Sequence, residues 1–138
     1  MVLLKRILII VFIFSMIGAI ISCSKNIEQI GTLEGTVRIG PIWPVERPGE
    51  NPPVSPEVFE ARKVMVYDKT GKKLIEEVDI IQVSHSQEGQ YSVQLKPGTY
   101  VVDINRIGID RSAEVPREVE IKAGDTFKLD IEIDTGIR

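Results

Sequence analysis

His85 is the one histidine of this 138-residue chain, and it lies between Ser84 and Ser86. A serine nucleophile activated by a histidine base is therefore the first chemistry to consider. That chemistry needs the two side chains to meet in space, with a third group orienting the histidine, and neighbours in sequence do not provide this. We interpret His85 as a solvated loop residue and predict that the chain is not an enzyme.

Metal binding is the second chemistry that these residue types could support. A zinc or iron site needs three or four ligands, and a single histidine leaves mainly carboxylates to supply them. Asp125, Asp130 and Asp134 are spread along one segment and lack the dense spacing of a calcium loop. Asp103 and Asp110 show no such pattern either. We interpret these carboxylates as solvated and expect no metal ion or other cofactor.

The single cysteine, Cys23, ends an apolar N-terminal run. Lys5 and Arg6 precede the apolar residues 7–21, and Ser22 comes directly before the cysteine. A basic start, a short apolar core and a small residue at the cleavage point are typical of a secretory signal. A transmembrane anchor is the alternative, but this run is shorter than the roughly 20 residues that a span needs.

The residues Ile20-Ile21-Ser22-Cys23 resemble a bacterial lipobox. The resemblance implies that the Cys23 thiol carries a diacylglycerol and becomes the first residue of a palmitate-bearing lipoprotein, held on the membrane by its acyl chains. An unmodified free thiol is the alternative. We expect a lipoprotein signal peptide at residues 1–22, a lipidated cysteine and tether at 23–31, and one domain at 32–138. The expected location is the bacterial cell envelope, at the outer membrane or the cell surface.

The mature chain is acidic. Lys5 and Arg6 leave with the leader, so 15 basic and 20 acidic residues remain, a formal net charge of −5. Nucleic-acid-binding modules carry clustered lysine and arginine, so we expect no nucleic-acid partner. No disulfide is available to the mature domain, which must therefore depend on its apolar core.

Alternation of apolar and polar residues with a period of two predicts strands along most of residues 32–138. The first covers 33–39, with Leu33, Val37 and Ile39 inward and Gly35 at an inward position that indicates a bulge or a close backbone approach. Further strand regions are 58–67 and 74–84, and in the second the alternation slips near residues 80–81, which indicates a bulge. The mature chain shows no useful length of helical periodicity.

The pattern of apolar and polar residues in 91–104 predicts a β-hairpin around Pro97-Gly98. Six apolar residues would pair across it on one face: Tyr91 with Ile104, Val93 with Val102, and Leu95 with Tyr100. The other face is mostly polar, so we expect the hairpin to pack on a second layer.

A second hairpin is predicted around residues 123–125. Its register pairs Val119 with Leu129 and Ile121 with Phe127. The same register sets Glu120 opposite Lys128, and Glu118 opposite Asp130 at a small like-charge cost. With six or seven short strands, the chain is predicted to be all-β, an immunoglobulin-like antiparallel β-sandwich of about seven strands.

Residues 40–57 contain six of the eight prolines and the only tryptophan, Trp43. Such a density of proline predicts a long surface loop, and long loops are usually functional or mobile. One interpretation is that Ile42, Trp43 and Val45 pin the loop to the sandwich. The other is that Trp43, together with Val45, contacts a partner.

The chain resembles the carboxypeptidase regulatory-like domains, which have a transthyretin-like sandwich. The resemblance is carried by Gly71, the run Gly89–Val93 and the run Leu95–Tyr100. Residues 40–48 and 134–138 also resemble a bacterial subset that often has loop cysteines, which this chain lacks. The related hydroxyisourate hydrolases have several histidines and a terminal Tyr-Arg-Gly-Ser, so a hydrolase is only a remote alternative here.

From this resemblance we assume that the first and last strands run parallel. The proline-rich loop and the C-terminal tail would then meet at one pole, with Glu46, Arg47, Asp134 and Arg138 within reach of each other. A bidentate Arg47–Asp134 pair would latch the loop. The alternative is a frayed terminus.

Two classes of function remain. One is a non-catalytic binding module that meets an unknown protein or glycan through residues 40–57. The alternative is a structural accessory domain that spaces or stabilises neighbouring envelope components. In both, the membrane is a partner through the lipid anchor.

Overall fold

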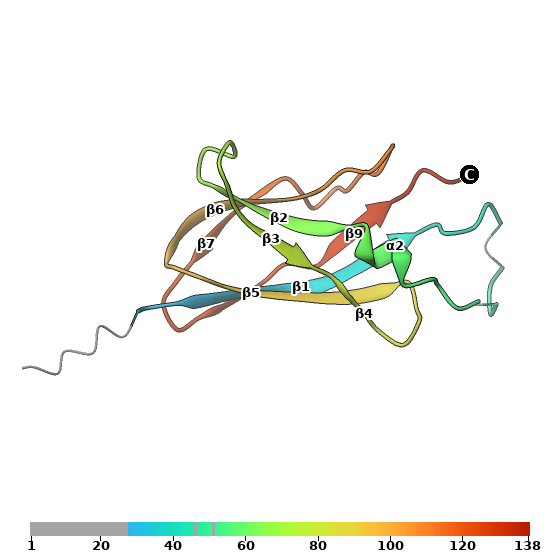
Figure 1. Ribbon diagram of the computed structural model, residues 1–138, viewed down its shortest axis with the longest axis horizontal. Helices are drawn as coiled ribbons and strands as arrows, with labels where there is room; N and C mark the ends of the chain where they lie inside the picture. The colour runs from blue at the N-terminus through green and yellow to red at the C-terminus, as the bar shows by residue number, and fades with distance from the viewer. Residues whose placement is uncertain (1–27, 46, 51) are drawn as a thin grey trace, which may run out of the picture.

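The computed structural model describes residues 28–45, 47–50 and 52–138, and these fold into a sandwich of two β-sheets with nine strands (Figure 1). Sheet A contains, in spatial order, β4 (Ile81–Gln82), β5 (Glu88–Leu95), β1 (Gly31–Gly40) and β8 (Thr126–Lys128), with β9 (Ile131–Asp134) also paired with β1. Sheet B contains β3 (Leu74–Asp79), β2 (Lys63–Asp68), β6 (Gly98–Ile104) and β7 (Arg117–Ile121). The predicted two-layer β-sandwich is confirmed, with nine strands in place of about seven. The prediction that it is antiparallel is wrong for sheet A, because β8 and β9 run parallel to β1. The predicted signal peptide and Cys23 lie outside the described residues.

β1 is the central strand of sheet A, and its burial follows the sequence alternation. Leu33, Val37 and Ile39 are fully buried, as predicted. At Gly35 an added Cβ would lie 2.0 Å from the Leu129 carbonyl oxygen, so the predicted close backbone approach is confirmed. β1 runs antiparallel to β5 and parallel to β8 and β9, which confirms the parallel first and last strands.

The predicted pairing of β5 with β6 is wrong, because these consecutive strands belong to opposite sheets. β5 pairs with β1 and β4, whereas β6 pairs with β2 and β7. The apolar side chains still point inward, and they face each other across the sandwich: Tyr91, Leu95, Val102 and Ile104 are buried, and Val93 and Tyr100 pack beside them. Alternation determines which face of a strand points inward, but it does not determine which other strand pairs with it.

The predicted second hairpin is wrong for the same reason. β7 lies in sheet B and β8 in sheet A. Glu118 lies opposite Val101, and Glu120 lies opposite Thr99. The like-charge pair of Glu118 with Asp130 is therefore never formed, and neither is the Glu120–Lys128 pair.

Two strand regions begin or end differently from the prediction. Region 74–84 divides into β3 of sheet B and β4 of sheet A, so the slip at residues 80–81 marks a change of sheet and not a bulge. Region 58–67 opens with a short helix, α2 (Glu57–Glu60), because Phe59 turns into the core before β2 begins. A register shift occurs instead between Val66 and Tyr67.

The sandwich has two poles, joined by β1. At about 3.3 Å per residue, the ten residues of β1 carry the chain from its entry to the opposite end. We call that end the distal pole and define it as the loop 41–56, α2, the β4–β5 turn 83–87 and the tail 135–138. Figure 1 shows these segments together at one end of the molecule, with the described N-terminus at the other.

Candidate binding surface at the distal pole

The proline-rich loop is anchored where it returns to the sandwich. Val54 is buried, and its N–H donates to the His85 carbonyl at 2.8 Å. The Val54 carbonyl accepts from the Gln82 side-chain amide at 3.0 Å, and the same amide nitrogen donates to the Ser86 carbonyl at 3.0 Å. The end of the loop is therefore held against the β4–β5 turn by the buried valine and by backbone and side-chain hydrogen bonds.

Trp43 and Val45, the two residues predicted to contact a partner, have different surroundings. Ile42 and Trp43 are half-buried and pack against the core, which agrees with the interpretation that they pin the loop. Val45 is 73% exposed, so it does not serve as a pin. Trp43 is therefore partly covered by the core, whereas Val45 is exposed.

A cleft of about 500 Å³ lies between the loop and the β4–β5 turn. Trp43, Pro52 and Pro53 line it from the loop, while the facing residues are polar or charged, among them Arg38, His85 and Glu88. Ligand sites commonly have this size and combine an apolar wall with a few hydrogen-bonding groups. The cleft could hold part of a ligand against the Trp43 side chain.

The turn that carries His85 has an unusual backbone. Ser84 and His85 have φ values of 49° and 53°, a left-handed conformation that is uncommon outside glycine. The Ser86 hydroxyl donates to the Val83 carbonyl at 2.6 Å and accepts from the Glu88 N–H at 3.1 Å. These bonds give Ser86 a role in shaping the turn, and the exposed His85 lines the cleft.

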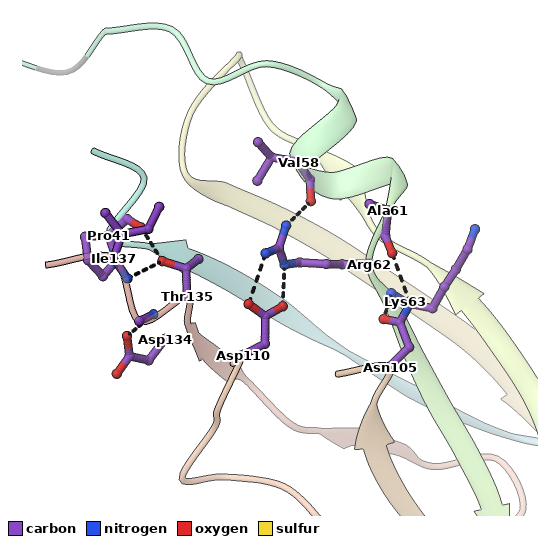
Figure 2. Close-up of polar contacts among 11 residues, drawn as sticks. Pro41, Val58, Ala61, Arg62, Lys63, Asn105, Asp110, Asp134, Thr135 and Ile137 are labelled. Carbon is purple, nitrogen blue, oxygen red and sulfur yellow. Dashed lines mark hydrogen bonds and ion pairs between the residues drawn. The ribbon is translucent and has the colours of Figure 1, made fainter. Parts of the chain in front are cut away.

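The C-terminal tail meets the loop at this pole, as predicted (Figure 2). The parallel ladder places Asp134 beside Gly40. The Thr135 N–H donates to the Gly40 carbonyl at 3.1 Å, and the Thr135 hydroxyl donates to the Pro41 carbonyl. These bonds join the tail to the first residues of the loop.

Asp134 is ionised at the base of the tail. Its carboxylate lies 3.0 Å from Arg138 and 3.8 Å from Arg111, and it accepts from the Gly136 N–H at 2.9 Å. The Arg138 guanidinium and this N–H lower the pKa of Asp134 to about 2. Asp134 also exchanges backbone hydrogen bonds of 2.9 and 2.7 Å with Arg111.

The predicted Arg47–Asp134 pair is wrong. Arg47 lies 3.9 Å from Glu50, and both side chains are exposed. The loop turns back on itself here, with the Glu50 N–H donating to the Arg47 carbonyl, which keeps Arg47 beside its sequence neighbour. Glu46 lies outside the described residues.

A buried ion pair behind α2 was missed by the sequence argument (Figure 2). Arg62 approaches Asp110 with two nitrogens, at 2.8 and 3.1 Å, and donates to the Val58 carbonyl at 2.8 Å. Asp110 is 5% exposed, so its interpretation as a solvated residue is wrong. No local pattern could have indicated this pair, since the partners are 48 residues apart.

Asn105 makes a second link beside this ion pair. Its side-chain oxygen accepts from the Lys63 N–H at 2.6 Å, and its amide donates to the Ala61 carbonyl at 3.0 Å. The junction of α2 and β2 is therefore tied to the segment that follows β6. Together with the Arg62–Asp110 pair, this link holds α2 at the distal pole.

Asp130, one of the aspartates considered as a metal ligand, accepts hydrogen bonds within the chain. The Asp130 carboxylate accepts from the Thr36 N–H at 2.8 Å and from its hydroxyl at 2.9 Å, which lowers the pKa of Asp130. Within residues 28–45, 47–50 and 52–138, no three histidine, cysteine or acidic side chains are grouped to hold a metal ion. In the same part of the chain, no helix has the length and apolar character needed to cross a membrane.

No protein-family model matches the chain, and no curated protein matches it in sequence. Among solved structures it is similar to GBS52, the minor pilin of Streptococcus agalactiae (15% identity, TM-score 0.46, 77% of this chain and 44% of that one). It is also similar to a DUF3823 family protein from Parabacteroides merdae (18%, 0.37, 75% and 46%). A third is a leucine-rich repeat protein from Bacteroides thetaiotaomicron (10%, 0.36, 80% and 14%). This chain spans less than half the length of each.

Proposed function

We propose that the chain is a lipid-anchored envelope protein whose β-sandwich is a non-catalytic binding module that presents its distal pole to a protein or a glycan. The observation that carries this proposal is the course of β1. Cys23 precedes the start of β1 at Gly31 by only eight residues, a tether of at most about 28 Å. An anchor there keeps the end of the sandwich at which β1 begins near the membrane. The distal pole then points away from the membrane.

The anchoring of the distal pole supports a role in binding. Its loop is held at Val54, at Trp43 and at the tail, so the cleft does not have to be ordered when a ligand arrives. A preformed surface loses less conformational entropy on binding, which favours affinity. The exposed Val45 adds an apolar contact beside the cleft.

We also propose membership of the carboxypeptidase regulatory-like domains. The residues of the motif have positions that suit this assignment. Gly71 closes the turn after β2 with φ 70°, and Tyr91 and Leu95 are buried in β5. Lys96 and Pro97 carry the chain from one sheet to the other. These features favour the fold of that family and carry no information on activity.

A structural spacer is the second candidate. The half-buried Trp43 favours it, because a tryptophan that packs on the core is accounted for by stability alone. The two candidates differ in whether the exposed groups of the distal pole matter to a partner.

Lipid attachment is tested by Cys23→Ala in the full chain. The variant should lose acyl labelling and keep its leader uncleaved by the lipoprotein peptidase. Ser22→Ala keeps a small residue before the cysteine and serves as the matched control. Normal processing and lipid labelling of Cys23→Ala would overturn the anchor.

Binding at the distal pole is tested by capture from envelope extracts with residues 24–138. Val45→Glu changes an exposed group of the pole, Arg38→Ala changes an exposed residue of β1 that lines the cleft, and Lys69→Glu changes the β2–β3 turn at the other end of the sandwich. A partner retained by Lys69→Glu and lost by the pole variants supports a binding module. A partner that all three variants retain supports the spacer.

A further inference from the structure

β5 has an edge that no strand of the described residues covers beyond Gln90. On one side β5 pairs with β1 over its whole length, from Glu88 to Leu95. On the other side the two-residue β4 reaches only Gly89 and Gln90. Residues 91–95 therefore form an exposed sheet edge, which can accept an added strand.

The backbone groups at this edge can be assigned from the ladder. The Gln87 carbonyl accepts from the Ile39 N–H on β1, and backbone groups alternate in direction along a strand. Odd-numbered residues of β5 thus direct their N–H and C=O toward β1. Ser92 and Gln94 direct theirs to the open side, where the described part of the chain offers them no partner.

A groove of about 910 Å³ borders this edge. Its apolar surface comes from the buried Val78, the half-buried Val93 and the exposed Ile81, and the residues Tyr91 and Ser92 also line it. An extended segment that paired with β5 would lie in this groove, with alternate side chains toward its apolar surface.

The charges around the groove favour a segment with basic side chains. Five acidic residues line it, against one lysine, Lys128: Glu34, Glu76, Glu77, Asp79 and Asp130. Asp79 pairs with Lys63, and Asp130 accepts from Thr36, which leaves Glu34 on β1 and Glu76 and Glu77 on β3; the last two lie on the strand that faces the open part of β5 across the groove. A second copy of this acidic edge would be repelled, whereas lysine or arginine would be attracted.

We propose that the β5 edge and this groove accept an extended, basic segment of another protein. The segment adds to sheet A through hydrogen bonds with Ser92 and Gln94, and its cationic side chains lie against Glu76 and Glu77. Acidic residues on β3 guard that strand against pairing. The open part of β5 carries no charge and has no such guard. This lateral surface is separate from the distal pole.

The test uses the full chain in a non-ionic detergent and the peptide acetyl-Lys-Val-Lys-Val-Lys-Val-Lys-amide. The peptide should slow amide exchange at Ser92 and Gln94 about tenfold or more, since these amides pass from solvent to a ladder. Binding should weaken as salt rises. The matched peptide with glutamate in place of lysine should not protect these amides.

Three variants locate the site. Gln94→Pro removes the outward N–H without touching the β1 ladder, and Ser92→Lys repels the basic peptide, so each should lower its affinity about tenfold or more. Glu76→Gln with Glu77→Gln should flatten the salt dependence, while Glu118→Gln on β7 should change nothing. Equal binding of the glutamate peptide, unchanged affinity in both edge variants, or protection that depends on protein concentration without peptide would overturn the proposal.

Discussion

Arg62 and Asp110 join two segments beside α2 that are not paired in a sheet. Desolvating both charges costs free energy, which two direct contacts and the Arg62 bond to the Val58 carbonyl offset. A buried pair of this kind adds little net stability over apolar residues of similar size, but it is costly to break. Its main effect is on geometry, because it holds α2 against the segment that follows β6.

Removing one partner should therefore be severe. Arg62→Ala leaves the Asp110 carboxylate buried and unpaired, and we expect the free energy of unfolding to fall by about 3–5 kcal/mol. Arg106→Ala breaks the more exposed pair with Asp103 (side chains 41% and 24% exposed), which should cost less than about 1 kcal/mol. Urea denaturation measures both, and equal losses would contradict the prediction.

Because Asp134 is titratable, we expect the stability of the C-terminal tail to depend on pH. Its pKa is lowered from 3.8 to about 2 by Arg138 and the Gly136 N–H. Because the folded pKa is below the unfolded one, the stabilisation is complete above about pH 4. It is lost as the pH falls toward 2, so the tail should loosen in that interval.

Carbon NMR titration of the Asp134 carboxyl measures this effect. Arg138→Ala should raise the pKa of Asp134 toward its ordinary value, and Arg111→Ala should raise it less, because Arg111 lies 3.8 Å away and Arg138 lies 3.0 Å away. A titration unchanged by Arg138→Ala would contradict the assignment.

At the scale of elements, β1 is the strand on which sheet A is built. Its parallel ladder with β8 and β9 is interrupted at residues 129–130, and nearby groups fill the gap. The Leu129 N–H donates to the Glu34 carbonyl, and the Tyr91 hydroxyl donates to the Leu129 carbonyl at 2.7 Å. Gly35 permits this approach because it has no side chain. Burial also raises the pKa of Tyr91.

Two tyrosines allow a matched test of this junction. Tyr91→Phe leaves the Leu129 carbonyl without its buried donor, which should cost about 1–3 kcal/mol of unfolding free energy. Tyr100 donates to the Lys96 carbonyl at the same 2.7 Å, but in an exposed setting. Since water can replace that bond, Tyr100→Phe should cost less than about 1 kcal/mol. Thermal or urea unfolding compares them, and a larger loss for Tyr100→Phe would refute this account.

At the scale of the molecule, the two ends of the described chain lie at opposite poles of the sandwich. The N-terminal segment enters β1 at one pole, and the C-terminal tail ends at the other, beside the loop (Figure 1). Thr135 bonds both Gly40 and Pro41, so the tail contributes to the order of the distal pole. The loop therefore depends on residues almost a hundred positions away in the sequence.

Deleting residues 135–138 should loosen this loop. The Thr135 hydrogen bonds are lost, so amide exchange and proteolysis between residues 42 and 54 should become faster, while β2 and β6 keep their protection. Arg138→Ala keeps Thr135 in place and serves as the control. Unchanged protection of the loop in the deletion would show that Val54 and Trp43 hold it alone.

Local patterns in the sequence were enough to determine several features of this protein. The alternation placed Leu33, Val37 and Ile39 in the core, because side-chain direction along a strand depends on position alone. Asp68 and Gly71 are residue types typical of a turn, and Gly71 has the positive φ that favours glycine there. The inward face of residues 91–104 and the looped nature of most of residues 40–57 were likewise available before the structure.

Strand pairing and side-chain partners were decided by the tertiary structure. The connection at Lys96 and Pro97 suits either a hairpin or a crossing between the two sheets. Both arrangements place the same side chains inside, so alternation could not distinguish the hairpin from the crossing. Asp110 pairs with Arg62, and Asp134 with Arg111, because distant segments pack together, which no local spacing records. Side-chain alternation acts within one strand, whereas pairing and burial depend on the packing of the whole sandwich.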